Sequence, residues 1–168
     1  MEFLWNALGG TLWGKLLVTL LISMVPVIEL RGAIPVAILA HGLNPVLAYF
    51  VAVVGNLIPV PFIIIFIRKI FAFIRKHIPF LNKMVDKLEE KGKSKKDAVM
   101  KWGFWGLFLF VAIPLPGTGA WTGALIAAML DMRLKRAFPS ILLGVLTAGL
   151  VITLLVQFGL AAVIGFQA

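Results

Sequence analysis

Residues 26–35 read Pro26-Val27-Ile28-Glu29-Leu30-Arg31-Gly32-Ala33-Ile34-Pro35 and place a carboxylate and a guanidinium in an otherwise apolar stretch. Apolar runs flank this pair at residues 16–28, where only Thr19 and Ser23 are polar, and at residues 33–40. Each run is shorter than the roughly 20 residues that a membrane-spanning helix needs. We therefore expect two half-helices joined by a tip at Glu29 and Arg31, rather than one continuous rod.

The composition indicates what surrounds this tip. Of the 168 residues, 61% are hydrophobic and 14% are charged, which leaves too little polar surface for a water-soluble globule. The chain is therefore expected to be an integral membrane protein with room for a single domain. The hairpin at about residues 12–41 would then enter the membrane and turn back inside it.

The same order of elements occurs twice along the chain. The first repeat, residues 1–67, has a hairpin at about 12–41 and a transmembrane helix at about 43–67. The second repeat, residues 99–168, has a hairpin at about 99–131 and a transmembrane helix at about 137–164. Pro139 is expected in the first turn of this last helix. A basic connector, residues 68–98, contains an amphipathic helix at about 80–91. The predicted fold is all-α: an inverted repeat of two re-entrant helical hairpins, each followed by a long transmembrane helix, plus one amphipathic surface helix.

Positive charge sets the expected orientation. The chain has 16 Lys and Arg against 7 Asp and Glu, and 11 of the 16 lie in residues 68–101. Because Lys and Arg are retained on the cytoplasmic side, this connector is expected to be cytoplasmic and nucleic acid is not an expected partner. The second hairpin then returns to the cytoplasm at the basic turn with Arg133, Lys135 and Arg136. Two repeats of opposite orientation are typical of alternating access to a site near the midplane.

Glu29 and Arg31 are the strongest candidates for function, because charges at membrane depth are costly and mark functional sites. Residues two apart do not face each other on a helix, but an unwound tip between Pro26 and Pro35 would let both reach one cavity. Arg31, with the next half-helix beginning near Gly32, is expected to bind a phosphate or carboxylate, and Glu29 is expected to couple protons. The alternatives are an ion pair that only fixes the tip, or charges that lie at the interface because the first run spans the membrane.

The second tip, residues 114–119, brings turn-forming residues and one hydroxyl but no charge. Its prolines and glycines prevent helix continuation, and a half-helix starting near Ala120 would point backbone amides at the midplane. The residues expected to face the substrate here are Pro116, Gly117, Thr118, Gly119 and Trp121. Alternatively, the glycines serve only close helix packing. Asn56 and the other intramembrane polar residues are expected to be interhelical hydrogen-bond partners.

No cofactor, metal centre or enzyme active site is expected. The chain has no cysteine and only two histidines, His41 and His77, which excludes thiolate chemistry and a histidine-rich metal centre. No Walker loop, dinucleotide fingerprint or nucleophile elbow occurs in the sequence. His41 is expected to be an ordinary loop histidine at the outer turn.

Two segments, Glu29-Leu30-Arg31-Gly32-Ala33-Ile34-Pro35 and Pro114-Leu115-Pro116-Gly117-Thr118-Gly119-Ala120-Trp121, resemble the small multidrug export family of prokaryotic membrane proteins. This resemblance covers nearly the whole chain. The layout is similar, more remotely, to the DedA/VTT superfamily, whose members are thought to have two opposed re-entrant hairpins and to move lipids, including undecaprenyl phosphate. The resemblance implies a protein of the prokaryotic inner (cytoplasmic) membrane and functional roles for Glu29 and Arg31. The arginines typical of a DedA tip are absent from residues 114–121.

These observations favour a transporter or lipid translocase for an amphiphilic, anionic substrate, with Arg31 holding the head group and Glu29 coupling protons. Two alternatives stay open: a proton-coupled exporter of small cationic drugs that bind Glu29, and a non-transporting membrane scaffold whose basic helix at 80–91 docks anionic lipid or a partner protein. The expected partners are membrane lipids and the transported amphiphile. We also expect a two-fold homodimer, because a membrane protein of this size buries little area per protomer.

Overall fold

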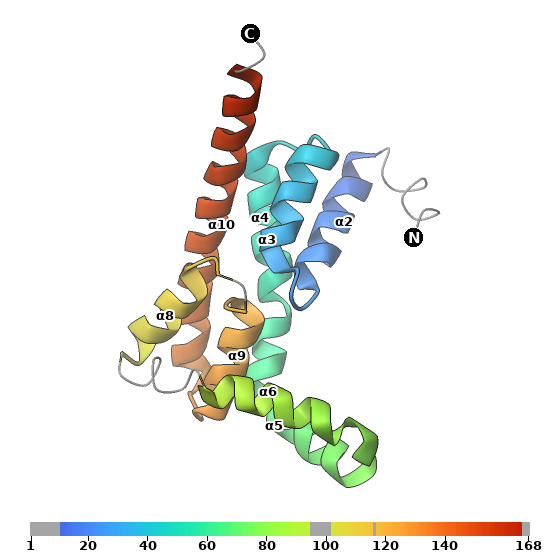
Figure 1. The fold of residues 1–168 in the computed structure, drawn as a ribbon, viewed down its shortest axis with the longest axis vertical. Helices are drawn as coiled ribbons and strands as arrows, with labels where there is room; N and C mark the ends of the chain where they lie inside the picture. Colours follow the sequence, from blue (N-terminus) through green and yellow to red (C-terminus); the bar gives the residue numbers. More distant parts are fainter. Residues whose placement is uncertain (1–10, 95–101, 116, 166–168) are drawn as a thin grey trace. The chain divides into compact units, whose positions relative to one another are not determined.

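The computed structural model describes residues 11–94, 102–115 and 117–165, and these residues form helices joined by turns, with no strand among them (Figure 1). The elements are α2 (Leu12–Met24), α3 (Glu29–Pro35), the π-helical turn η1 (Val36–Ala40), α4 (Pro45–Leu57), α5 (Pro59–His77), the 3₁₀ turn η2 (Pro79–Leu81), α6 (Asn82–Ser94), α8 (Phe104–Ala112), α9 (Ala120–Met129) and α10 (Leu134–Gly165). The predicted all-α class is confirmed.

Two stretches of the described chain are long and apolar enough to cross a membrane, Pro45–His77 with 33 residues and Leu134–Gly159 with 26 residues. Each exceeds the roughly 20 residues that a spanning helix needs. These two stretches support the prediction of a multi-pass membrane protein. Two shorter apolar helices, Leu12–Met24 and Ala120–Met129, belong to the two predicted hairpins.

The bounds of the long helices differ from the prediction. The first was expected at about 43–67, but α4 and α5 together continue to His77 with one interruption at Ile58. Pro59 follows the interruption at the first position of α5, where its missing N–H removes no intrahelical bond. Arg75 and Lys76 lie in the last turn of α5, where cations interact favourably with the unpaired carbonyls of the helix C-terminus.

The position predicted for Pro139 is also wrong. α10 begins at Leu134, three residues earlier than expected, so Pro139 lies inside the helix and not in its first turn. Beyond the first turn, a proline removes one backbone hydrogen bond to the residue four positions earlier. The helix nevertheless continues through Pro139 to Gly165.

The chain divides into two compact units that differ from the predicted repeats, and the predicted repeat boundaries stay a prediction. The first unit comprises Met1–Leu57 and Val145–Ala168, and the second comprises Ile58–Gly144. Residues 95–101, the end of the predicted connector and the start of the second hairpin, lie outside the described residues.

In the first unit, α2 and α3 form a hairpin that packs against α4 (Figure 1). A Cβ added at Gly55 of α4 would lie 2.5 Å from the backbone oxygen of Leu20 and would also collide with the Ser23 hydroxyl. The two helix backbones can approach this closely only because position 55 is glycine. The last part of α10 belongs to the same unit, and its Leu146 carbonyl accepts a hydrogen bond of 3.1 Å from the Tyr49 hydroxyl.

In the second unit, α5 packs against α9 and α6 around a buried cluster of Phe71, Val85 and Leu125. A helix is therefore present close to the predicted range of 80–91, beginning at Asn82, and its buried Val85 faces this protein's own helices. Gly144 of α10 packs against α8, since a Cβ there would meet Val111 at 2.6 Å. The same two helices are linked by a hydrogen bond from the Ser140 hydroxyl to the Phe104 carbonyl.

Candidate functional site

The first hairpin bends at a short tip, residues 25–28, between Met24 of α2 and Glu29 of α3. The Glu29 amide donates a hydrogen bond of 3.0 Å to the Val25 carbonyl and so closes the tip. Val27 and Glu29 have left-handed backbone conformations, with φ of 80° and 50°. Each such residue costs about 1–2 kcal/mol unless it is glycine, so the surrounding structure holds the tip in this shape.

The tip presents apolar side chains at its surface. Val27 is 93% exposed, and Val25 and Ile28 are also exposed. Turns in water are dominated by Gly, Asn, Asp and Ser, which supply turn geometry and polar groups. A strained, exposed turn made of Val-Pro-Val-Ile is instead suited to an apolar environment.

Glu29 and Arg31 lie directly behind this tip and differ in exposure. The Glu29 side chain is buried, at 4% exposure, whereas Arg31 is partly exposed. The Glu29 carboxylate lies close enough to interact electrostatically with the Arg31 guanidinium. The structure therefore places the two charges in one local site within the first unit.

The expected unwound segment from Pro26 to Pro35 is shorter than predicted. α3 begins at Glu29 and not near Gly32, because the Gly32 amide already donates to the Ile28 carbonyl at 3.0 Å. Glu29 and Arg31 are thus in the first turn of a helix. The left-handed φ of Glu29 departs from regular helical geometry at the first of these two positions.

Gly32 has a packing role at this tip. A Cβ at position 32 would lie 2.5 Å from the Ile28 Cγ2 atom, so a larger residue would push the tip side chain aside. The Gly32 amide is used by the bond to Ile28. Binding of a substrate by Gly32 stays a prediction.

Two further polar residues are buried at the same end of the first unit. Ser23, at the end of α2, is fully buried and donates its hydroxyl to the Leu20 carbonyl at 2.7 Å. Asn56, at the end of α4, is 1% exposed, and neither polar atom of its side-chain amide has a hydrogen-bond partner among the described residues. The expected interhelical hydrogen bond of Asn56 is therefore not present there.

The opposite end of the first hairpin carries a contact that the sequence analysis missed. The Lys15 ammonium donates a hydrogen bond of 2.7 Å to the His41 carbonyl, which follows the last turn of η1. Burial of the imidazole, reinforced by the positive charge of Lys15, lowers the pKa of His41. At 6% exposure His41 is not the ordinary loop histidine that we expected. The available signal was Lys15 itself, the single charge in the first apolar helix.

The second tip lies in the second unit and is closed by its own hydroxyl. The Thr118 Oγ1 atom is 2.8 Å from the carbonyl oxygens of both Ile113 and Leu115, and its one proton serves one of them at a time. Gly117 and Gly119 have φ of 81° and 136°, which favour glycine.

The remaining predicted residues of this tip lie around the start of α9. α9 begins at Ala120, as expected for the second half-helix, and Trp121 is half-buried in its first turn. Pro116 lies outside the described residues. Gly117, Thr118, Gly119 and Trp121 are therefore neighbours in the second unit, whereas Glu29, Arg31 and Gly32 are neighbours in the first. Their contact with a substrate stays a prediction.

Comparison with known proteins gives one match. No curated protein and no solved structure matches the chain. A protein-family model matches residues 29–151, which begin at Glu29, directly after the first tip, and include the second tip. This range covers well over half of the chain and supports a membrane protein of the transport class. The chain belongs to the family described as "Putative small multi-drug export protein".

Proposed function

We propose that the protein is a secondary transporter or lipid translocase that moves an amphiphilic, anionic substrate and couples this movement to protons. A phospholipid or a polyprenyl phosphate has the required chemistry. The observation that carries the proposal is the pair of Glu29 and Arg31 at the first tip, with the carboxylate buried and the guanidinium partly exposed.

The difference in exposure favours an anionic head group. A ligand that reaches this pair meets the accessible charge first, and that charge is the guanidinium of Arg31. Arginine presents several N–H donors in one plane, which matches the oxygen atoms of a phosphate or carboxylate. Glu29, at 4% exposure, is poorly placed to be the first contact of a bulky cation.

The apolar surface of the tip favours a substrate with apolar chains. Val25, Val27 and Ile28 are exposed next to the charged pair. An exposed apolar surface beside a polar group is suited to a molecule with a hydrocarbon part and a charged head. A small hydrophilic anion would make no apolar contact with these side chains.

Glu29 supplies a simple way to couple protons to the substrate. When Glu29 is ionised, it compensates the charge of Arg31, and an anionic head group gains little by binding. When Glu29 is protonated, the guanidinium is left uncompensated and attracts the anion. Proton binding and anion binding thus stabilise the same state, which is the condition for thermodynamic coupling.

The proposal retains the architecture expected from the sequence. Both hairpins are taken to be re-entrant and the repeats to be inverted, with residues 68–101 on the cytoplasmic side of a prokaryotic inner membrane. Gly117, Thr118, Gly119 and Trp121 are taken to contribute the second contact surface for the substrate. The apolar Val-Pro-Val-Ile turn and the two short apolar helices support this insertion.

The family match favours one second candidate, a proton-coupled exporter of small cationic drugs. In that case Glu29 binds the cation and Arg31 only modulates the carboxylate. The two candidates differ in the residue that binds the substrate, so substitution of Arg31 separates them.

Transport by the purified, reconstituted protein tests the proposal. The assay measures translocation of a fluorescent anionic phospholipid in proteoliposomes with and without a pH gradient, alongside uptake of a cationic dye. Glu29→Gln is expected to abolish the stimulation by the gradient, whereas Glu90→Gln, which removes an exposed carboxylate of α6, should behave like the wild type. Arg31→Ala should abolish translocation of the anionic lipid, and Arg31→Lys should retain part of it because it keeps the charge but loses the planar donor set.

Two results would contradict the proposal. Gradient-driven transport by Glu29→Gln at the wild-type rate would remove the coupling role of Glu29. Cationic dye transport that survives Arg31→Ala but is lost in Glu29→Gln would establish the drug-export alternative.

A further inference from the structure

The second unit contains a pocket at the junction of α5, α6 and α9. Its volume is about 270 Å³, and it is lined by Arg68, Phe71, Ala72, Arg75, Glu89 and Met129. Phe71 and Met129 give the pocket an apolar side, whereas the two arginines and Glu89 give it a polar side. It therefore combines apolar and charged surfaces in one small volume.

Arg68 and Arg75 are arranged to act on one ligand. They are seven residues apart on α5, which places them two turns apart on the same helix face. Each is positioned by a carboxylate from a neighbouring element: Arg68 pairs with Asp131, and Arg75 pairs with Asp86 at 2.9 Å and Glu89 at 3.1 Å. These pairs hold both guanidinium groups at the pocket.

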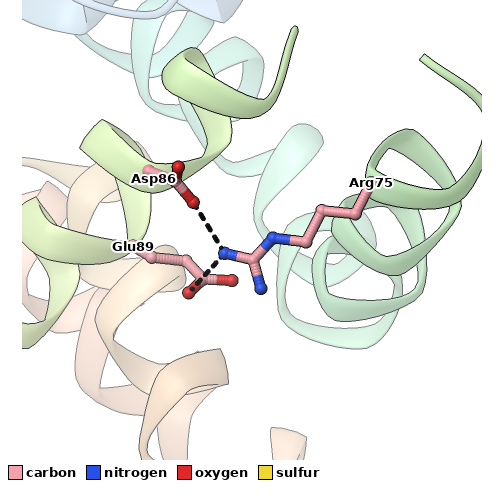
Figure 2. A network of polar contacts seen from close by, with 3 residues as sticks. All are labelled: Arg75, Asp86 and Glu89. Atoms are coloured by element: carbon pink, nitrogen blue, oxygen red, sulfur yellow. Dashed lines mark hydrogen bonds and ion pairs between the residues drawn. The ribbon is translucent and has the colours of Figure 1, made fainter. Parts of the chain in front are cut away.

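The guanidinium of Arg75 keeps donors for a further acceptor. Figure 2 shows that the contacts to Asp86 and Glu89 both end on one nitrogen, Nη2. Arginine carries five N–H donors, so the existing ion pairs do not exhaust them. The pairs of Arg68 with Asp131 and of Arg75 with Asp86 are also largely exposed, and exposed ion pairs contribute little stability, so another anion can replace the carboxylate.

The surroundings of the pocket are basic. Among the residues of the second unit whose side chains are described, Lys and Arg outnumber Asp and Glu; besides the two pocket arginines they are Lys69, Lys76, Lys83, Lys87, Arg133, Lys135 and Arg136, against Asp86, Glu89, Glu90 and Asp131. A surplus of positive charge at a membrane surface attracts anionic lipid.

The pocket lies at the level of the lipid head groups. The apolar stretch Pro45–His77 has 33 residues, whereas about 20 suffice to cross the hydrocarbon core. Residues 32–67 contain no Lys, Arg, Asp or Glu, and Arg68 is the first charge after them. Arg68 therefore marks the membrane interface, and Arg75 lies two turns further out.

We propose that this pocket binds the phosphate of a membrane phospholipid as a resident ligand, with Arg68 and Arg75 as its donors and Phe71 and Met129 against the upper part of the acyl chains. This site is separate from the transport site proposed at Glu29 and Arg31. Glu89 stands at the wall of the pocket and opposes an additional negative charge. Its carboxylate limits the affinity of the pocket for anionic head groups.

The test uses native mass spectrometry of the full-length protein in detergent, titrated with phosphatidylglycerol and with a diacylglycerol of the same chains, which lacks the phosphate. The wild type should retain phosphatidylglycerol and not diacylglycerol. The double variant Arg68→Gln/Arg75→Gln should bind phosphatidylglycerol at least about tenfold more weakly, because two charge-assisted contacts are lost. The matched control Lys69→Gln/Lys76→Gln removes the same charge one residue along α5 without touching the pocket lining, and should bind within about twofold of the wild type.

A second variant distinguishes a true loss of lipid binding from a folding defect in the arginine double variant. Glu89→Gln keeps both arginines and removes the opposing carboxylate, so it should bind phosphatidylglycerol about threefold more tightly, whereas the exposed control Glu90→Gln should not. Equal losses in the arginine and lysine variants would show that general surface charge binds the lipid and would overturn the proposal. Weaker binding by Glu89→Gln would also overturn it, because removal of the opposing carboxylate should tighten binding at the pocket. Displacement of the lipid by inorganic phosphate at the same concentration would also overturn it, since the ligand would then be free phosphate. The loss of about tenfold caused by Arg68→Gln/Arg75→Gln should be the same in an Arg31→Ala background as in the wild-type background, which separates binding at this pocket from binding at the proposed transport site.

Discussion

Glu29 and Arg31 are separated by one residue, yet the structure gives them different environments. Glu29 is buried and Arg31 is partly exposed, although both follow the same tip. The sequence was sufficient to select the pair, because two charges in an apolar stretch are costly unless they serve a function. It could not predict which charge is buried. That depends on the left-handed backbone at Val27 and Glu29, which no propensity scale favours for these residue types.

The environment of His41 also could not be predicted from the sequence. Its position near a Gly-Leu-Asn turn suggested an exposed loop residue, but the hydrogen bond from Lys15 to its carbonyl ties the turn to α2. A contact between residues 26 positions apart depends on how the hairpin folds back. Local sequence patterns do not contain that information.

The lowered pKa of His41 predicts a pH dependence of stability. Because burial and Lys15 disfavour the protonated imidazole in the folded state, the unfolded chain binds the proton more readily, with an ordinary histidine pKa of about 6.5. The contribution to stability is therefore complete above about pH 6.5 and is lost as the pH falls through the lower pKa of the folded state. The thermal unfolding midpoint in detergent should fall between pH 7 and pH 5.

One variant separates this effect from other titrations. His41→Gln should flatten the slope of the unfolding midpoint over this pH range, because it removes the imidazole whose pKa folding lowers. An unchanged slope in His41→Gln would show that other groups produce it.

At the scale of elements, the order of helices was predictable and their ends were not. Apolar runs broken by Pro and Gly correctly indicated two long helices, and they also indicated the breaks that separate α2 from α3 and α8 from α9. The ends of α5 and α10 extend into charged sequence, where Arg75 and Lys135 continue a helix instead of ending it. Charge patterns mark where the membrane ends, and helices extend past that boundary when polar residues can continue them.

The close packing of α2 against α4 makes a prediction about Gly55. Gly55→Ala should destabilise the protein by about 1–3 kcal/mol, since the new methyl group would meet the Leu20 backbone carbonyl, which cannot rotate away. Gly159→Ala is the matched control, because a Cβ at that position of α10 has no atom within 4 Å. Thermal unfolding in detergent should show a loss for the first variant and none for the second. Equal midpoints for both variants would mean that α2 and α4 do not pack in this way.

At the scale of the whole molecule, charge and hydropathy predict the membrane class and the family match supports it. The re-entrant insertion of the hairpins, their inverted orientation and the expected homodimer are statements about the protein in a bilayer. They rest on the distribution of Lys and Arg and on the apolar tip around Val27. Of these, the depth of the first tip in the membrane bears most directly on the proposed transport mechanism, because a tip at the surface would leave Glu29 and Arg31 outside the hydrocarbon.

That depth can be measured with spin labels, since the chain contains no cysteine and each introduced cysteine is unique. Val27→Cys labels the first tip, and Phe80→Cys labels the basic connector; the two native side chains are 93% and 90% exposed, so both labels should be tolerated. In reconstituted protein, collision of the label with oxygen, which concentrates in the hydrocarbon, is compared with collision with a polar nickel complex, which stays in water. The label at Val27 is predicted to be accessible to oxygen and shielded from nickel, and the label at Phe80 is predicted to be accessible to nickel. A label at Val27 that collides with nickel as readily as the label at Phe80 would contradict the account.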